Sequence, residues 1–346
     1  MVPASKATLS ETRHAAARAA AAGRRAGYRR GVSDALLRRL TGAAVIANLV
    51  GQVLIVLTGG AVRLTGSGLG CSTWPQCEPG SFTPVFHEAM GMHVFVEFGN
   101  RMIGVLLGLV GIALAVLTTL AVRRLGRSED VSWLAYGVLV GVVLQGVVGG
   151  VSVRLDLHPG IVGSHFLLSG ALLVLSTLLA VRWFEGDGAR RLLGGRTLRS
   201  VAAVVALLAV VVVVLGVVVT GAGPHSGDDE VGYRFAVDPY LVARMHAAAV
   251  WLFLVTQVAL LVAAARTRPV LPALRRWSLV LLAVTLAQGL IGYVQFFTGL
   301  PELLVGAHML GAALLIVATT RTVLTLRTRE PEVVEQPRRP AAAMAD

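Results

Sequence analysis

The chain has 346 residues and a formal net charge of +12; 55% of its residues are hydrophobic and only 14% are charged. Soluble domains carry about 25% charged residues, so this composition excludes an ordinary soluble protein. A positive charge of this size would suggest nucleic acid as the partner of a soluble protein, and the location of the basic residues decides the matter.

Eight apolar segments follow one another, each close to the ~20 residues that a helix needs to cross the hydrocarbon core of a bilayer. They lie at residues 42–62, 102–122, 131–153, 160–181, 200–222, 245–265, 277–297 and 303–320. Helical pattern begins before Glu97 and before Arg244, so the second and sixth segments are expected to extend outward. The sequence therefore predicts an all-α polytopic membrane protein with eight transmembrane helices.

The basic residues lie mostly on one side of these predicted spans. Of the 31 Lys and Arg residues, 26 lie in the two terminal segments and in the connections at 123–127, 182–199 and 266–276. The positive-inside rule places these segments, and both termini, in the cytoplasm. The basic excess is thus a topology signal, and we expect an integral protein of the cell membrane with no nucleic-acid partner.

Two segments of the sequence each recur later in the chain, separated from their copies by the same number of residues. "LQGVVGGV" at 144–151 returns as "AQGLIGYV" at 287–294, and "VGSHFLLSGALL" at 162–173 returns as "VGAHMLGAALLI" at 305–316, both 143 residues later. A T-G-x-G turn also follows the first and fifth spans, at Thr65 and Thr220. Repeats of four crossings each predict two parallel, duplicated four-helix bundles.

These patterns divide the chain into five parts. They are a basic cytoplasmic arm at 1–40, an N-terminal four-helix half at 41–183, a cytoplasmic linker at 184–199, a C-terminal four-helix half at 200–325 and a disordered cytoplasmic tail at 326–346.

Histidines gather on the outer side. Seven of the eight lie in outer loops or near outer helix ends: His87, His93, His158, His165, His225, His246 and His308. Two of them, His165 and His308, are equivalent in the repeat. Each is either a packed interior histidine or a metal ligand, because two imidazoles from facing helices can hold a haem iron inside a bundle. His246 would be the facing partner of His308.

In the first half, Asn100 occupies the position equivalent to His246. His93, Glu97 and Asn100 share one helix face at i, i+4 and i+7. Glu97 either pairs with Arg101 at i+4 or serves acid–base chemistry beside a half-formed metal site. The sequence leaves both interpretations open.

Four arginines are expected at the outer edge of the membrane, at about the same depth as these histidines. Their side chains either extend toward the membrane surface or bind carboxylates such as haem propionates. They are Arg63, Arg101, Arg154 and Arg244.

Cys71 and Cys77 are the only cysteines, in a loop that the charge distribution places outside. A disulfide is the expected state in an oxidising compartment, and it either staples the loop or exchanges redox equivalents.

The chain resembles the haem A synthases, membrane enzymes that convert haem O to haem A. The resemblance rests on "VRLTGSGLGCSTWPQC", "VEFGNRMIG", "GSHFLLSG", "TGAGPHSGDD", "RMHAAAVW" and "VGAHML", in this order. It implies eight transmembrane helices in two similar halves. It also implies that a ring methyl group of haem O is oxidised to a formyl group by successive hydroxylations, with water as the oxygen source.

The resemblance assigns roles to individual residues. His246 and His308 would hold the iron of a cofactor haem b in the C-terminal half, and His165 would be a ligand to the haem O substrate in the N-terminal half. Glu97 matches the catalytic glutamate of the family. Cys71 and Cys77 match its outer-loop cysteine pair.

Two features depart from the family pattern. Many members carry a histidine where Asn100 stands, so substrate coordination would rest on His165 alone or with His93 or a water. Many bacterial members carry a second cysteine pair where this chain has "GPHSGDDE". Two histidines in one half and one in the other leave a free coordination position only in the N-terminal half.

The resemblance also implies membrane lipid, a haem O synthase, a terminal oxidase and an electron acceptor of unknown identity as partners. Two other functions are open. A b-type cytochrome subunit for electron transfer predicts balanced histidine pairs, which Asn100 opposes, and a membrane haem carrier needs no carboxylate at Glu97.

Overall fold

A computed structural model describes residues 7–85, 91–225, 227–228 and 232–329. Eight of its helices are long and apolar enough to cross a membrane, which confirms the predicted polytopic all-α class. The elements are α1 (Ala7–Leu64), α2 (His93–Leu125), α3 (Asp130–Arg154), α4 (Pro159–Glu185), β1 (Arg190–Leu192), α5 (Arg196–Ala222), α6 (Pro239–Arg266), α7 (Pro272–Phe297), α8 (Glu302–Leu324) and β2 (Arg327–Arg329).

Helix ends follow local sequence signals. Proline occupies the first turn of α4, α6 and α7, where its missing N–H leaves no intrahelical bond unmade. Asp238 caps α6, because its carboxylate accepts hydrogen bonds from the backbone N–H groups of Tyr240 and Leu241. α2 stops at Gly126, which adopts the left-handed conformation with φ 66°. As expected, α2 and α6 begin well before their apolar segments.

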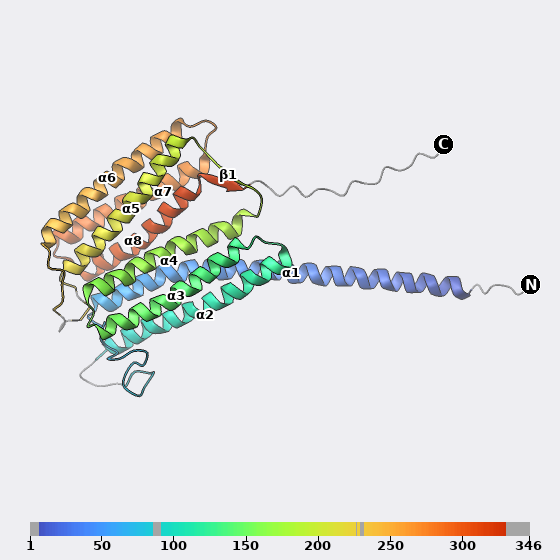
Figure 1. The fold of residues 1–346 in the computed structure, drawn as a ribbon, viewed down its shortest axis with the longest axis horizontal. Coiled ribbons are helices and arrows are strands. Elements are labelled where there is room, and N and C mark those ends of the chain that lie inside the picture. Colours follow the sequence, from blue (N-terminus) through green and yellow to red (C-terminus); the bar gives the residue numbers. More distant parts are fainter. Residues whose placement is uncertain (1–6, 86–90, 226, 229–231, 330–346) are drawn as a thin grey trace, which may run out of the picture.

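The helices form two groups of four (Figure 1). In the first group α1 contacts α2 and α4, α2 contacts α3, and α3 contacts α4. In the second group α5 contacts α6 and α8, α6 contacts α7, and α7 contacts α8. The order of neighbours is therefore the same in both groups, as a duplicated bundle would require; the duplication itself stays a prediction.

The two groups meet along α1, α4, α5 and α8. α8 contacts both α1 and α4, and α4 contacts α5. Near the ends of α1 and α5, Arg63 donates a hydrogen bond from Nη2 to the carbonyl of Thr220 at 3.0 Å. The N–H of Gly68 donates to the carbonyl of Gly227 at 2.7 Å. The T-G-x-G turns at Thr65 and Thr220 therefore take part in joining the two groups, at the end of the bundle where Cys71 and Cys77 lie.

Each group has an apolar core with a few polar ties. Val45, Leu114 and Leu179 are fully buried in the first group. Between α1 and α4, the Asn48 amide donates to the Ser176 hydroxyl at 2.9 Å. Large apolar side chains on the outward faces remain exposed, as expected of helices that face lipid tails.

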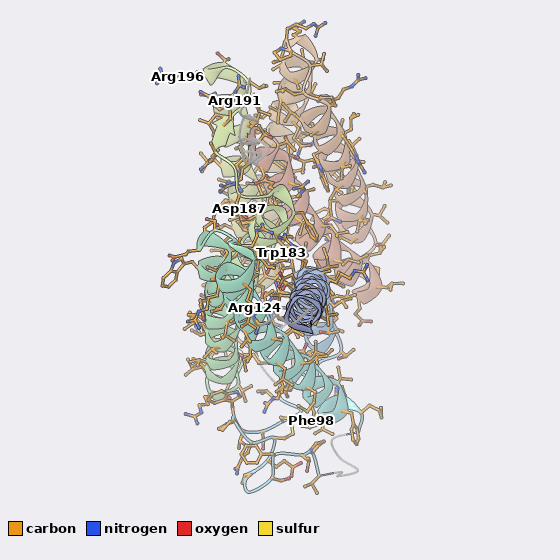
Figure 2. The ribbon with its side chains drawn as sticks, turned by 90° about the vertical axis from the view of Figure 1, so that its right-hand side faces the viewer. Phe98, Arg124, Trp183, Asp187, Arg191 and Arg196 are labelled. Carbon is orange, nitrogen blue, oxygen red and sulfur yellow. A yellow bond between two sulfur atoms is a disulfide. The ribbon has the colours of Figure 1, made fainter. Side chains whose placement is uncertain are left out.

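The opposite end carries the basic connections, and Figure 2 labels Trp183 and Asp187 there. Arg182 is buried and binds both Asp130 and Asp187. Arg127 pairs with Asp187 and lies over the ring of Trp183, 4.6 Å from its centroid. We call these five residues the basic-end cluster; it ties α3 to α4 and to the following connection.

The sequence-based boundaries change at this end. α1 is continuous from Ala7, so the predicted arm and the first span form one helix. β1, within the predicted linker, pairs antiparallel with β2, whose residues 327–329 belong to the predicted disordered tail. The tail expectation is therefore wrong for 327–329, because backbone pairing with a distant segment orders it, and the remainder at 330–346 lies outside the described residues.

Candidate active site

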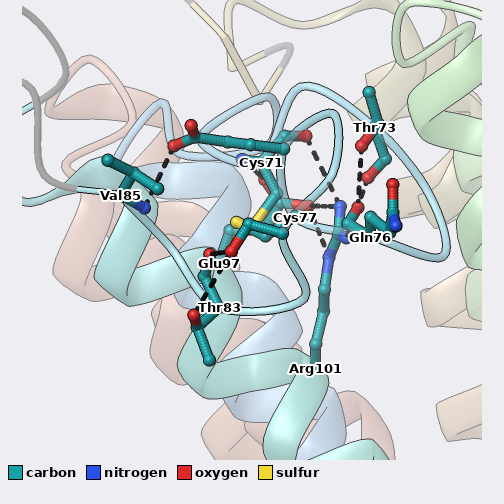
Figure 3. Close-up of a disulfide and its surroundings, with 10 residues drawn as sticks. Cys71, Thr73, Gln76, Cys77, Thr83, Val85, Glu97 and Arg101 are labelled. Atoms are coloured by element: carbon teal, nitrogen blue, oxygen red, sulfur yellow. Dashed lines mark hydrogen bonds and ion pairs between the residues drawn. A yellow bond between two sulfur atoms is a disulfide. The ribbon is translucent and has the colours of Figure 1, made fainter.

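The connection from α1 to α2 contains the two cysteines, which form a disulfide in the structure (Figure 3). Both are buried, together with Val94 in the first turn of α2. We call residues 67–81 the disulfide loop. Gly70 lies directly on the start of α2: a Cβ there would come 2.6 Å from the His93 carbonyl oxygen. This position therefore needs glycine for the loop to reach the helix.

Glu97 connects α2 to the disulfide loop. Its Oε2 accepts a hydrogen bond from the Cys71 N–H at 2.6 Å, and its Oε1 accepts one from Nε of Arg101 at 3.0 Å. It is also the one acidic residue in the buried class among the described residues. The structure thus contains the Glu97–Arg101 pair that the sequence offered as one of two interpretations.

Arg101 serves the loop as well as Glu97. Its Nη1 donates to the carbonyl oxygens of Thr73 at 2.9 Å and Gln76 at 3.2 Å, and Nη2 donates to that of Cys71 at 3.4 Å. All three guanidinium nitrogens therefore have protein partners. Figure 3 shows the side chain reaching up from α2 into the loop. In this arrangement Arg101 holds the loop and does not face an open site.

The other three candidate arginines differ in their surroundings. Arg154 donates to the Trp74 carbonyl at 2.9 Å, so it also contacts the disulfide loop. Arg63 binds the Thr220 carbonyl, while its buried Nε has no hydrogen-bond partner among the described residues. Arg244 is exposed. Arg63 and Arg244 thus keep donors that an acidic ligand could use.

His93 and Asn100 each have a partner from the chain before α2. The Nδ1 of His93 lies 3.0 Å from the Ser67 hydroxyl. The Thr58 hydroxyl on α1 donates to Oδ1 of Asn100 at 2.8 Å. Sequence reasoning missed both partners, because residues on different helices are matched only by packing. The Thr58 hydroxyl thus fixes the position of the Asn100 amide oxygen.

Three histidines, His165, His246 and His308, lie inside the bundle. The Nδ1 atoms of His165 and His308 are buried and lack a hydrogen-bond partner within the described chain, whereas the His246 ring interacts with the backbone of Val212. The rings of His246 and His308, from α6 and α8, lie with their centroids 6.5 Å apart and their planes inclined at 75°. The structure therefore brings together the pair that the sequence predicted from two separate helices.

This separation fits two imidazoles that approach one metal ion from opposite sides, because each metal–nitrogen bond is about 2 Å long. No group of three or more His, Cys, Asp or Glu side chains suited to a metal occurs in the part of the chain that the structure describes. Two imidazoles alone suit an iron whose other ligands come from a porphyrin. The buried nitrogens without partners are consistent with such a group.

The remaining candidates are separate from this pair. The hydrogen bonds that place Glu97 go to Cys71 and Arg101, and none within the described residues joins it to His165. His158 caps α4 through its own ring, and His87 lies outside the described residues. The structure thus has two centres, one at the paired histidines and one under the disulfide loop.

Fold and site together define an integral membrane protein of eight helices, with paired imidazoles in one four-helix group and a buried carboxylate under a disulfide loop in the other. The chain belongs to the cytochrome oxidase assembly protein family, whose family model matches residues 43–224, just over half of the chain.

Several curated bacterial proteins named Heme A synthase are similar to this chain. That of Lysinibacillus sphaericus (strain C3-41) is 33% identical over 143 residues, covering 41% of this chain and 44% of the relative. That of Geobacillus kaustophilus (strain HTA426) is 35% identical over 132 residues, covering 37% and 39%. That of Symbiobacterium thermophilum is 34% identical over 149 residues, covering 42% and 46%. The chain spans about half the length of the curated relatives it matches.

Proposed function

We propose that the protein is a haem A synthase, which oxidises a ring methyl group of haem O to a formyl group by successive hydroxylations. The family to which the chain belongs and the name shared by its relatives support this activity. The observation that carries the proposal is the asymmetry between the halves: paired histidines in one, and a single buried histidine with Asn100 and Glu97 in the other.

The C-terminal half is the proposed cofactor site. His246 and His308 would hold the iron of a haem b, because their ring centroids lie 6.5 Å apart. Held by these two histidines, the haem b would supply electron transfer. Arg244, which is exposed, is a candidate for its propionates.

The N-terminal half is the proposed site of the haem O substrate. His165 would bind its iron from one side. Asn100, whose oxygen is held by Thr58, stands at the position that His246 occupies in the other half. Because Asn100 supplies no second imidazole, His165 alone would hold the substrate iron in this half. His93 is held by Ser67 and is the second candidate for this side.

Glu97 is the proposed proton acceptor, because a buried carboxylate beside the substrate can take protons released by the attacking water. Arg101 and the Cys71 N–H would fix its orientation, so that it acts from one position. The disulfide loop would cover this half and limit the entry of bulk water. Electrons released by the oxidation pass to an acceptor outside the chain.

The surroundings of the protein follow from this activity. We propose that both termini are cytoplasmic, that a haem O synthase supplies the substrate and that a terminal oxidase receives the product. Among the alternatives, the b-type cytochrome subunit is disfavoured by Asn100, since two balanced haem sites would need a histidine there.

The test is pigment extraction from bacteria that make haem O and lack their own haem A synthase. Expression of the chain should produce haem A, and the purified protein should show a low-spin haem b spectrum. His308→Ala should remove the haem b. Glu97→Gln should keep haem b and abolish haem A formation.

His158→Ala is the matched control, because His158 caps α4 at the same end of the bundle and lies outside both centres. It should keep both pigments. No haem A with the unmodified chain would reject the function. Haem A formed at an unchanged rate by Glu97→Gln would reject the role of Glu97 alone.

A further inference from the structure

The repeated segments at 144–151 and 287–294 have no role in the site described so far. Each contains Q-G-x-x-G, with Gly149 and Gly292 as its last glycine, on α3 and α7. The glutamine of the first segment contacts the next helix: the Gln145 amide donates to the His165 carbonyl at 3.1 Å. The repeat therefore lies beside the helix that carries the buried histidine.

Each of these glycines lies against an imidazole. A Cβ at Gly149 would come 3.3 Å from Cε1 of His165, and a Cβ at Gly292 would come 3.4 Å from Cε1 of His308. The contact is thus the same in both groups of helices. Any side chain longer than a methyl group would occupy the space that the ring now fills.

The third buried histidine has the same kind of neighbour on a different helix. A Cβ at Gly216, on α5, would come 3.3 Å from Cε1 of His246 on α6. Gly216 lies outside the Q-G-x-x-G segments, so the same glycine–histidine contact also occurs without that motif. His165, His246 and His308 therefore each lie against a glycine of the preceding helix.

The Cε1 edge of the ring meets the glycine at all three sites. At Gly216 and Gly292 only Cε1 and Nδ1 of the histidine come within 4 Å of the added Cβ, whereas at Gly149 both Nδ1 and Nε2 of His165 lie at 3.9 Å. A neighbour without a side chain thus lets each ring lie close against the preceding helix.

We propose that Gly149, Gly216 and Gly292 are positioning residues that seat the imidazoles of His165, His246 and His308 for iron ligation. The three glycines contact the imidazole rings directly. The inference rests on the proposed function for the identity of the group that carries the iron. It gives the last glycine of each Q-G-x-x-G segment a role, which is to make room for the histidine of the next helix. In the first segment Gln145 also holds that helix through its hydrogen bond to the His165 carbonyl.

The test compares two glycines of α7 in the full-length protein purified in detergent. Gly292→Leu fills the space beside His308. Gly289→Leu is the matched control, because nothing lies within 4 Å of a Cβ at that position. The readouts are haem b per chain, the low-spin absorption spectrum and the helical circular dichroism after haem removal. His308→Ala is measured in parallel to test the ligand itself.

We expect Gly292→Leu to weaken haem b binding about tenfold, the size of effect typical of residues that orient metal ligands. Gly289→Leu should match the unmodified protein. If Gly292→Leu loses helical content, Gly292→Met replaces it, since methionine favours a helix over glycine; it should weaken haem b binding, while Gly289→Met leaves it unchanged.

Each other outcome has a defined meaning. If His308→Ala loses haem b but Gly292→Leu keeps it with an unchanged spectrum, the positioning role of Gly292 is rejected and His308 remains the proposed haem ligand. If both leucine variants lose haem b equally, the loss comes from a general disturbance of α7, and the positioning role of Gly292 is rejected. If His308→Ala also keeps haem b, both the proposed ligand pair and the positioning role of Gly292 are rejected.

The N-terminal half gives an independent test with haem O as the added probe. Gly149→Leu should weaken haem O binding about tenfold. Gly146→Leu should not, because a Cβ at Gly146 has nothing within 4 Å. Equal binding by the two variants would overturn the assignment of Gly149.

Discussion

Glu97 accepts a hydrogen bond from the backbone N–H of Cys71 at 2.6 Å, across 26 residues of sequence. The buried carboxylate is thereby attached to the loop that the disulfide closes. Because Arg101 binds the same carboxylate and three carbonyls of that loop, the loop and the proposed proton acceptor form one unit. A change in the loop should therefore alter the position of Glu97, and a change at Glu97 should alter the loop.

Replacing Arg101 should loosen the disulfide loop. Arg101→Gln removes charge-assisted hydrogen bonds, and we expect local opening of the loop to become easier by about 2 kcal/mol, which would speed disulfide reduction about thirtyfold. The measurement is the rate at which a phosphine reductant exposes Cys71 and Cys77 to alkylation, followed by mass spectrometry.

The control is Arg154→Gln, because Arg154 makes a single hydrogen bond to the loop, to the Trp74 carbonyl. Its effect should be clearly smaller. Equal reduction rates for Arg101→Gln and the unmodified protein would show that the loop does not depend on Arg101.

Opening the disulfide should affect turnover more than cofactor retention. The loop covers the half with Glu97, whereas His246 and His308 lie in the other half. We expect the Cys71→Ser/Cys77→Ser variant to keep its haem b and to form haem A about tenfold more slowly, since misplaced catalytic groups lose rate. Haem b content and haem A formation are measured on the same preparation. Loss of haem b with unchanged turnover per remaining haem would contradict the placement.

Asp187 in the basic-end cluster should make stability depend on pH. Burial raises the pKa of its carboxyl, but hydrogen bonds from Arg182 and Ser128 and the charge of Arg127 outweigh burial, so the pKa lies below its ordinary value. A depressed pKa stabilises the fold above the unfolded pKa of about 3.9, and this contribution is lost as the pH falls through the folded value.

The corresponding measurement is thermal unfolding in detergent between about pH 7 and pH 3. At neutral pH, Asp187→Asn should be less stable than the unmodified protein by about 2 kcal/mol. The difference should shrink as the acid limb is approached, because both proteins then lack the charge. A difference that stays constant over this range would mean that ionised Asp187 does not stabilise the fold.

Gly150 should tolerate no large side chain, because the indole of Trp74 lies on it: a Cβ there would overlap the ring. Gly150→Leu should displace Trp74 and destabilise the packing of the disulfide loop by about 2 kcal/mol. Tryptophan fluorescence and the rate of disulfide reduction report the change. Gly146→Leu, four residues earlier on α3, is the control and should leave both readouts unaltered.

The sequence by itself determined the number and type of the elements. Apolar segments of membrane-spanning length predict helices wherever they occur, because backbone polar groups in lipid must bond within the segment. The pairing of His246 with His308 was also predictable, since the repeat places His308 and the helical pattern places His246 on a facing helix. These features depend on local composition and on periodicity.

Only the tertiary structure decided how the polar residues are used. Arg101 was one of four equivalent candidates in sequence, and its contacts with Glu97 and the loop carbonyls became visible only after folding. The same holds for Thr58 at Asn100 and for the pairing of β1 with β2. Hydrogen bonds and close contacts between distant segments depend on three-dimensional packing, which no local pattern in the chain encodes.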